Sequence, residues 1–174
     1  MKNPLLSVFD TPQQSIPFSI IKPEHFIPAL KENIKNTLEG IDKIVNQIAP
    51  PSFENTIEAL QNLGELLERN SSILFNLNSA ETSDAIQATT QQASPLLTQF
   101  QNDVRLNQAL FERIKTIYQN QDLENLSAEQ QTLLEKEYKG FARNGALLND
   151  DEKELLREID TEKAQLSLTF GENV

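Results

Sequence analysis

The chemistry available to this sequence is limited by a single histidine. His25 is the only histidine of the 174-residue chain, cysteine is absent, and the carboxylate directly beside it is Glu24. A catalytic zinc usually takes three protein ligands, and the zinc-peptidase motif His-Glu-x-x-His needs two histidines one helical turn apart. Neighbouring residues on a helix or turn also point in different directions. We therefore predict that His25 is structural and that this chain contains no catalytic and no metal-binding residue.

The remaining polar clusters have simpler interpretations. Carboxylates gather at Glu135 and Glu137 and at Asp150–Glu152, where solvated surface and helix N-termini, which favour anions, explain them. Arg143 lies in a segment that could be a binding loop, but a helix end with a favourably placed cation is the preferred interpretation. A serine nucleophile would have only His25 to activate it, which makes acyl transfer by this chain alone improbable. Substrate-binding residues cannot be assigned.

Composition indicates a folded protein with an acidic surface. The chain has 15 Lys and Arg against 26 Asp and Glu, a net charge of −11, and 38% hydrophobic residues. No basic stripe is present that could neutralise phosphates, which argues against a nucleic-acid partner. The N-terminus has no signal-peptide pattern, and no apolar run approaches the roughly 18 residues of a membrane span. We expect a cytoplasmic protein with no membrane partner.

The apolar pattern predicts helices preceded by an extended arm. Pro4, Pro12 and Pro17 favour a non-helical arm over residues 1–22, which Phe9, Phe18 and Ile20 could anchor. A helix is then expected from Pro28 to the Pro50-Pro51 pair. Its apolar positions step by three or four residues, as one helical face requires. They are Leu30, Ile34, Leu38, Ile41, Val45 and Ile48.

Further helices follow from capping signals. Ser52 is expected to begin a helix that continues through Gly64, where a close helix crossing would explain the glycine. Ser83-Asp84 predicts the start of a third helix, in which Pro95 predicts a kink or a restart. Later helix ends are predicted by the capping box Ser127-Ala-Glu-Gln130, by Asn144-Gly145, by Asn149–Glu152 and by the polar linker 120–125.

No segment shows the sustained alternation of a β-strand. The fold class is therefore all-α, an irregular bundle of long antiparallel helices with an extended N-terminal arm. Residues 23–174 would form its helical lobe.

Several segments, in a consistent order along the whole chain, resemble the N-terminal region of the thimet-oligopeptidase-like zinc peptidases. They are Asn3-Pro-Leu-Leu6, Pro17-Phe, Ile21-Lys-Pro-Glu-His-Phe-Ile-Pro-Ala-Leu30, Ser52-Phe-Glu-Asn-Thr-Ile-Glu-Ala-Leu60, Gly64-Glu-Leu-Leu67 with Arg69, Asn107-Gln-Ala-Leu-Phe-Glu-Arg-Ile114, Gly145-Ala-Leu-Leu148, and Glu162 to Phe170 with Asn173. Within the family, the sequence is most similar to the bacterial branch that contains oligopeptidase A and peptidyl-dipeptidase Dcp.

This resemblance implies a nearly all-helical peptidase with a deep channel between two lobes. It would bind zinc through His-Glu-x-x-His and a downstream Glu, in a catalytic region that this sequence lacks. None of the matched positions is a zinc ligand or general base of the family. We therefore expect a fragment of a longer enzyme, inactive alone, that forms one wall of the channel entered by short peptides. Its partners would be short peptides and the missing catalytic lobe. Whether the parent enzyme is an endopeptidase or removes dipeptides is not decided by these residues.

The alternative is a stand-alone acidic helical module that binds another protein, because 174 residues can fold independently. The two hypotheses differ in what they predict beyond Val174 in the parent gene. A continuation that encodes His-Glu-x-x-His favours the peptidase lobe, and a stop codon favours the module. If a catalytic lobe normally packs on this one, some apolar side chains should be exposed.

Overall fold

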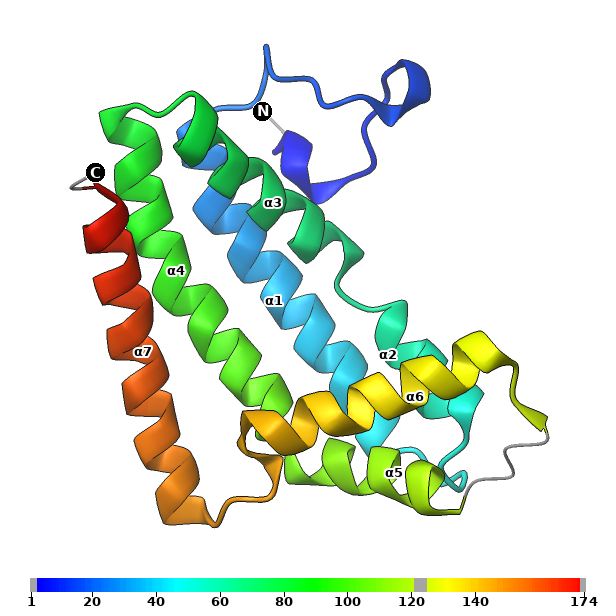
Figure 1. Cartoon of the computed structure of the whole chain (residues 1–174). Coiled ribbons are helices and arrows are strands. Elements are labelled where there is room, and N and C mark those ends of the chain that lie inside the picture. The colour runs from blue at the N-terminus through cyan, green and yellow to red at the C-terminus, as the bar shows by residue number, and fades with distance from the viewer. Residues whose placement is uncertain (1–2, 121–124, 173–174) are drawn as a thin grey trace. The chain divides into compact units, whose positions relative to one another are not determined.

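The chain folds into helices. A computed structural model describes residues 3–120 and 125–172, and no strand occurs among them. The predicted all-α class is therefore confirmed. The principal helices are α1 (Pro23–Val45), α2 (Ala59–Gln61), α3 (Glu65–Ala80), α4 (Asp84–Arg105), α5 (Gln108–Gln119), α6 (Ala128–Phe141) and α7 (Asp150–Glu172) (Figure 1). Across these described residues, no helix combines the length and the apolar content needed to cross a membrane.

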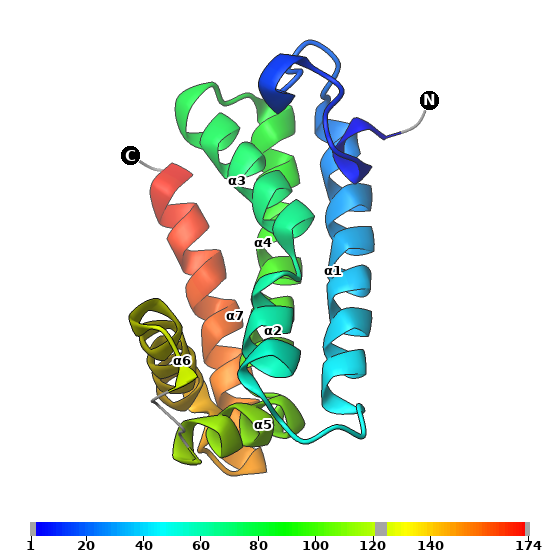
Figure 2. The same cartoon turned by 90° about the vertical axis from the view of Figure 1, so that its right-hand side faces the viewer.

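The helices belong to two compact units. The first unit consists of Met1–Thr37, Gly64–Thr98 and Glu162–Val174, and the second of Leu38–Leu63 and Gln99–Thr161. Within the first unit, α1, α3 and α4 run side by side, and α3 points opposite to the other two (Figure 1 and Figure 2). This is the antiparallel arrangement expected from the sequence.

The N-terminal arm of the first unit contains two single turns of 3-10 helix, η1 (Pro4–Leu6) and η2 (Pro12–Gln14). Phe9 is buried, with 6% of its surface exposed, as predicted for an anchor. Phe18 and Ile20 are 56% and 55% exposed, so their predicted anchoring role is wrong. The arm turns there through local backbone bonds, from the Phe18 N–H to the Ile16 carbonyl and from the Ile20 N–H to the Pro17 carbonyl. These bonds do not require the two side chains to be buried.

Helix α1 begins earlier and ends earlier than predicted. It starts at Pro23, where the missing N–H costs nothing, and Pro28 lies inside it. It ends at Val45, and Ile48 beyond it is fully exposed. The apolar spacing continued to Ile48, but the chain leaves the helix before that residue reaches the core.

Gly64 does not serve the predicted close helix crossing. It has a φ of 86° and separates α2 from α3, so the expected single helix is broken there. A Cβ atom at Gly64 would meet Thr37 only at ordinary contact distance, 3.7 Å. The close approach occurs instead at Gly40, where a Cβ atom would lie 2.5 Å from Cδ2 of Leu63. Periodicity did not reveal the break, because apolar spacing is similar on both sides of it.

The second unit has a continuous apolar core. It brings together the end of α1, the wide helical segment η3 (Phe53–Glu58), α5, α6 and the turn η5 (Ala142–Ala146). Phe111 stacks on both Tyr138 and Phe141, with ring centroids 5.8 and 6.3 Å apart. The buried residues of this core are Ile41, Ile44, Phe53, Ile57, Leu110, Phe111, Ile114, Leu134, Phe141 and Ala146.

Most of the predicted helix ends are present. The hydroxyl oxygens of Ser52 and Ser127 accept backbone N–H groups of the first turn, and both form capping boxes. Asn149 and Glu152 cap α7 reciprocally, and Ser83 accepts the N–H of Ile86 at the start of α4. Helix α4 continues through Pro95 to Arg105. The predicted linker 120–125 lies partly outside the described residues.

Gly145 ends the α6 segment in the left-handed conformation, with a φ of 96°. A Cβ atom there would lie 2.5 Å from Cδ2 of Leu156 and 3.0 Å from Cδ2 of Leu106. Both the backbone conformation and the space therefore require glycine.

The substitution Gly145→Ala should lower the free energy of unfolding by about 1–3 kcal/mol, because it adds backbone strain and overpacks a filled site. Urea unfolding followed by circular dichroism measures this loss. Gly171→Ala is the control, since nothing lies within 4 Å of a Cβ atom there and the residue is helical. Equal effects of the two substitutions would contradict the role of Gly145.

Candidate functional site

His25 is a structural residue of the first unit. Its Nδ1 atom accepts the backbone N–H of Lys22 at 3.1 Å, at the start of α1. Its backbone carbonyl accepts the Asn3 side-chain amide at 2.7 Å, which ties the arm to the helix. Among residues 3–120 and 125–172, no three His, Cys, Asp or Glu side chains come together in a way that could hold a metal ion. The imidazole therefore caps the start of α1, and this role requires no second histidine or carboxylate.

The other polar clusters have local partners in the helices. Glu135 pairs with Lys139 one turn later on α6, and Glu137 pairs with Arg105 of α4 at 3.2 Å. Glu152 caps the start of α7. Arg143 is exposed in the turn after α6, as expected of a cation near a helix end.

Arg69 of α3 is the main anchor of the N-terminal arm. Its Nη2 atom donates to the carbonyl oxygens of Leu5 at 3.0 Å and Ser7 at 3.1 Å. Its guanidinium lies 4.0 Å from the ring centroid of Phe9, a cation–π distance. Burial lowers the pKa of Arg69, and the neighbouring Glu65 acts in the opposite direction. Three arm residues are thus held by one planar cation.

Asn70 completes this anchor. The residue is fully buried, and its side-chain amide donates to the Leu5 carbonyl at 2.8 Å. The side-chain oxygen Oδ1 of Asn70 accepts hydrogen bonds from Nε and Nη2 of Arg69 at 3.3 and 3.2 Å. Sequence reasoning placed Arg69 in a family segment but gave it no role. Only the fold brings residues more than 60 positions apart into contact.

In the second unit, Arg113 binds the irregular segment from Ala49 to Thr56. It is a buried residue of α5 whose Nε donates to Thr56 Oγ1 at 3.2 Å and whose Nη2 donates to Asn55 Oδ1 at 3.0 Å. Both terminal nitrogens reach the Ala49 carbonyl at 3.4 Å. Burial lowers the pKa of Arg113. The charge is compensated by neutral oxygens of the segment from Ala49 to Thr56, which it fixes against α5.

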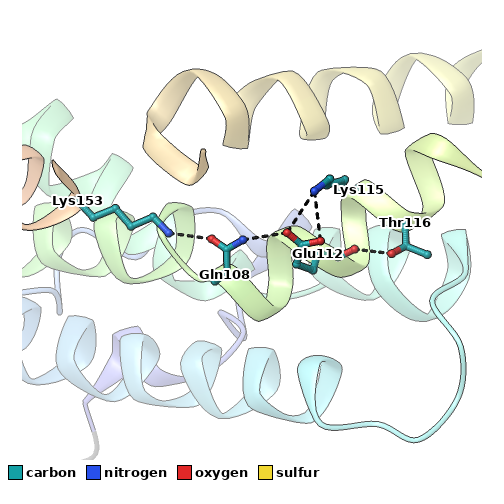
Figure 3. A network of polar contacts seen from close by, with 5 residues as sticks. All are labelled: Gln108, Glu112, Lys115, Thr116 and Lys153. Atoms are coloured by element: carbon teal, nitrogen blue, oxygen red, sulfur yellow. Dashed lines mark hydrogen bonds and ion pairs between the residues drawn. The ribbon is translucent and has the colours of Figure 1, made fainter. Parts of the chain in front are cut away.

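Figure 3 shows a polar network on the second unit that joins α7 to α5. Lys153 of α7 donates to Gln108 Oε1 at 2.8 Å, and Gln108 Nε2 donates to Glu112 Oε1 at 2.9 Å. Lys115 lies 3.4 Å from the same carboxylate oxygen. Exposed contacts of this kind contribute little free energy, but they orient the start of α7.

Comparison with known proteins identifies the family. The sequence profile described as "Neurolysin/Thimet oligopeptidase, N-terminal domain" matches residues 27–153, more than half of the chain. This chain belongs to the thimet oligopeptidase family. The resemblance seen in the sequence segments is thereby confirmed, and the match describes an N-terminal domain.

Individual members of the thimet oligopeptidase family align along almost the entire chain. The dipeptidyl carboxypeptidase of Salmonella typhimurium is 34% identical over 172 residues, 99% of this chain and 25% of the relative. Oligopeptidase A of Escherichia coli is 28% identical over 174 residues, 100% of this chain and 25% of the relative. A probable cytosolic oligopeptidase A of Arabidopsis thaliana is 28% identical over 175 residues, 99% of this chain and 24% of the relative. The chain therefore spans about a quarter of the length of these family members.

Replacing Arg69 should loosen the arm of this thimet oligopeptidase-family domain. Arg69→Met removes the donor to Ser7 and one of the two donors to Leu5, whose carbonyl keeps the Asn70 amide. It also takes Nε and Nη2 away from the side-chain oxygen of the buried Asn70, and a buried acceptor without a partner costs about 1–3 kcal/mol. We expect a lower free energy of unfolding by that amount and faster hydrogen exchange at the amides of Leu5 and Leu6. Arg143→Met, at an exposed position, should leave both unchanged. Unaltered exchange in Arg69→Met would show that the arm is held by other contacts.

Replacing Arg113 should destabilise the second unit. Arg113→Leu leaves Thr56 and the Ala49 carbonyl without their donor, so the free energy of unfolding should fall by about 1–3 kcal/mol. Lys115→Leu, on the same helix and paired only at the surface, should change it by less than about 0.5 kcal/mol. Urea unfolding measures both variants, and a loss in Lys115→Leu as large as that in Arg113→Leu would contradict this assignment.

Proposed function

We propose that this chain is the N-terminal helical lobe of a zinc-dependent oligopeptidase that hydrolyses short peptides. Residues 23–174 form one wall of the substrate channel, with residues 1–22 as an arm on that lobe. The observation that carries the proposal is the match over almost the whole chain to proteins named dipeptidyl carboxypeptidase and oligopeptidase A. The lobe cuts nothing when it is separated from the rest of its protein.

In this proposal, the zinc is held by the remaining three quarters of the polypeptide. The described residues do not fit a zinc site, because His25 is engaged as a helix cap and no ligand group surrounds it. Zinc would supply a polarised water for peptide hydrolysis in that other region. The residues of this chain contribute no step of that chemistry.

The helical lobe suits a wall because its surface is built from capped, anchored helices. Arg69 and Arg113 fix the two irregular segments that would otherwise be free to move. A stiff wall restricts entry by shape, so extended short peptides pass and folded proteins do not.

We also propose a cytoplasmic location. A relative from Arabidopsis thaliana is named a probable cytosolic enzyme, which supports this assignment. The stand-alone interaction module is the weaker hypothesis, because the profile that matches describes one domain of larger peptidases.

The test compares the 174-residue chain with its full-length parent protein. The full-length protein should cleave a short quenched fluorescent peptide, lose this activity on chelation and regain it with zinc. The 174-residue chain should release no product above the buffer rate and should copurify with no stoichiometric zinc. Zinc-dependent cleavage by the chain alone would overturn the proposal, and so would a parent gene that stops at Val174.

A further inference from the structure

Helix α7 carries an apolar stripe that nothing in the described chain covers. Its four large side chains are spaced by four, seven and four residues, so they fall on one side of the helix. Their exposed fractions range from 50% to 74%, although such residues normally lie in a core. The stripe consists of Leu155, Ile159, Leu166 and Phe170.

The other side of α7 is the one that is packed. Lys153 donates to Gln108 of α5 at 2.8 Å (Figure 3). Arg157 donates to Asp103 of α4 at 2.7 Å. Leu156 fills the space beside Gly145. Farther along the helix, Ala164 and Leu168 are half-buried. The helix thus has two apolar sides, and the stripe lies on the side away from these contacts, exposed among the described residues.

The charges beside the stripe restrict what can cover it. Glu158 and Glu162 lie along its edge and are exposed. Helix α7 contains eight acidic residues and three basic ones. Amphipathic helices that bind membranes are rich in Lys and Arg, so this composition opposes a lipid surface. A second copy of α7 would bring the same carboxylates together, which is unfavourable. The complementary partner has apolar side chains flanked by Lys or Arg.

Such a partner is available within the full-length protein. The chain corresponds to about a quarter of its relatives and matches a domain described as N-terminal, so most of a relative's chain lies outside this domain. We propose that the α7 stripe is the docking surface for the polypeptide that follows this domain. The docked segment presents an apolar face with flanking basic residues. The inference rests on the proposed function only in taking the chain as one lobe of a longer polypeptide.

Photo-cross-linking in the full-length protein tests this docking. A benzophenone-bearing phenylalanine analogue replaces Phe170 in one variant and Ile159 in a second. In the control it replaces Thr161, an exposed α7 residue on another side of the helix. Mass spectrometry then identifies the linked peptides. We expect about tenfold more intrachain cross-link from the two stripe positions than from Thr161, because a docked face stays in contact. The linked peptides should come from beyond residue 174 and contain Lys or Arg beside apolar residues.

Three results would overturn the inference: equal yields at all three positions, cross-links only between two copies, or linked peptides that are acidic. Carbene footprinting of the unsubstituted full-length protein gives a second measurement that does not depend on the variants. Labelling of Leu166 should be several-fold lower than labelling of Ile48, which is fully exposed, and equal labelling would contradict docking. Peptide hydrolysis is assayed on the same samples. Its loss without loss of cross-linking would refute the zinc-peptidase proposal alone, and the reverse result would refute docking alone.

Discussion

The second unit depends on the burial of one guanidinium. Arg113 lies among the apolar side chains of α5, and a buried cation is costly unless its N–H groups find acceptors. The acceptors come from a single irregular segment, through the Ala49 carbonyl, Asn55 and Thr56. Asn55 and Thr56 belong to the wide helical segment η3, and Ala49 precedes it. The same helical segment places Phe53 and Ile57 in the core, so polar satisfaction and apolar packing are achieved by one conformation.

In the first unit, Arg69 supplies donors to an irregular segment in the same way. The arm has no long helix, so its carbonyl groups need donors from elsewhere. Arg69 and Asn70 of α3 supply them, and Asn3 returns a donor to the carbonyl of His25. In both units, a non-repetitive segment is held by planar side chains projecting from a helix. The lone histidine belongs to this framework, where it caps the first long helix.

The family profile that matches this chain describes an N-terminal domain, and the chain spans about a quarter of the length of its relatives. His25 caps a helix, Arg69 anchors the arm and Glu135 pairs with Lys139 at the surface. Helix α7 keeps four large apolar side chains exposed among the residues that the structure describes. When a helix has apolar residues on two sides, the side that stays in water carries an unfavourable hydration free energy. A partner that covers this side removes that free energy cost.

The sequence by itself determined the helical class, the family and most helix ends. These depend on local chemistry: Ser127, Asn149 and Gly145 act through hydrogen bonds or backbone angles within a few residues. Local sequence signals did not locate a helix boundary where the apolar spacing continues unchanged across it. The apolar repeat passed through Gly64 and out to Ile48 without revealing that the helix breaks at one and ends before the other. Phe18 and Ile20 were predicted to be anchors because they are apolar, but hydrophobicity alone does not show which arm residues reach the helices.

Only the tertiary structure decided the roles of Arg69, Arg113 and the two sides of α7. Their long-range hydrogen-bond partners lie about 45 to 65 residues away in the chain, and such contacts leave no periodic trace in a single sequence. An apolar stripe shows that a helix face avoids water, but it is the same pattern whether the face meets its own core or another lobe. The difference depends on how much apolar surface the rest of the fold can cover, which is a property of the whole packed structure.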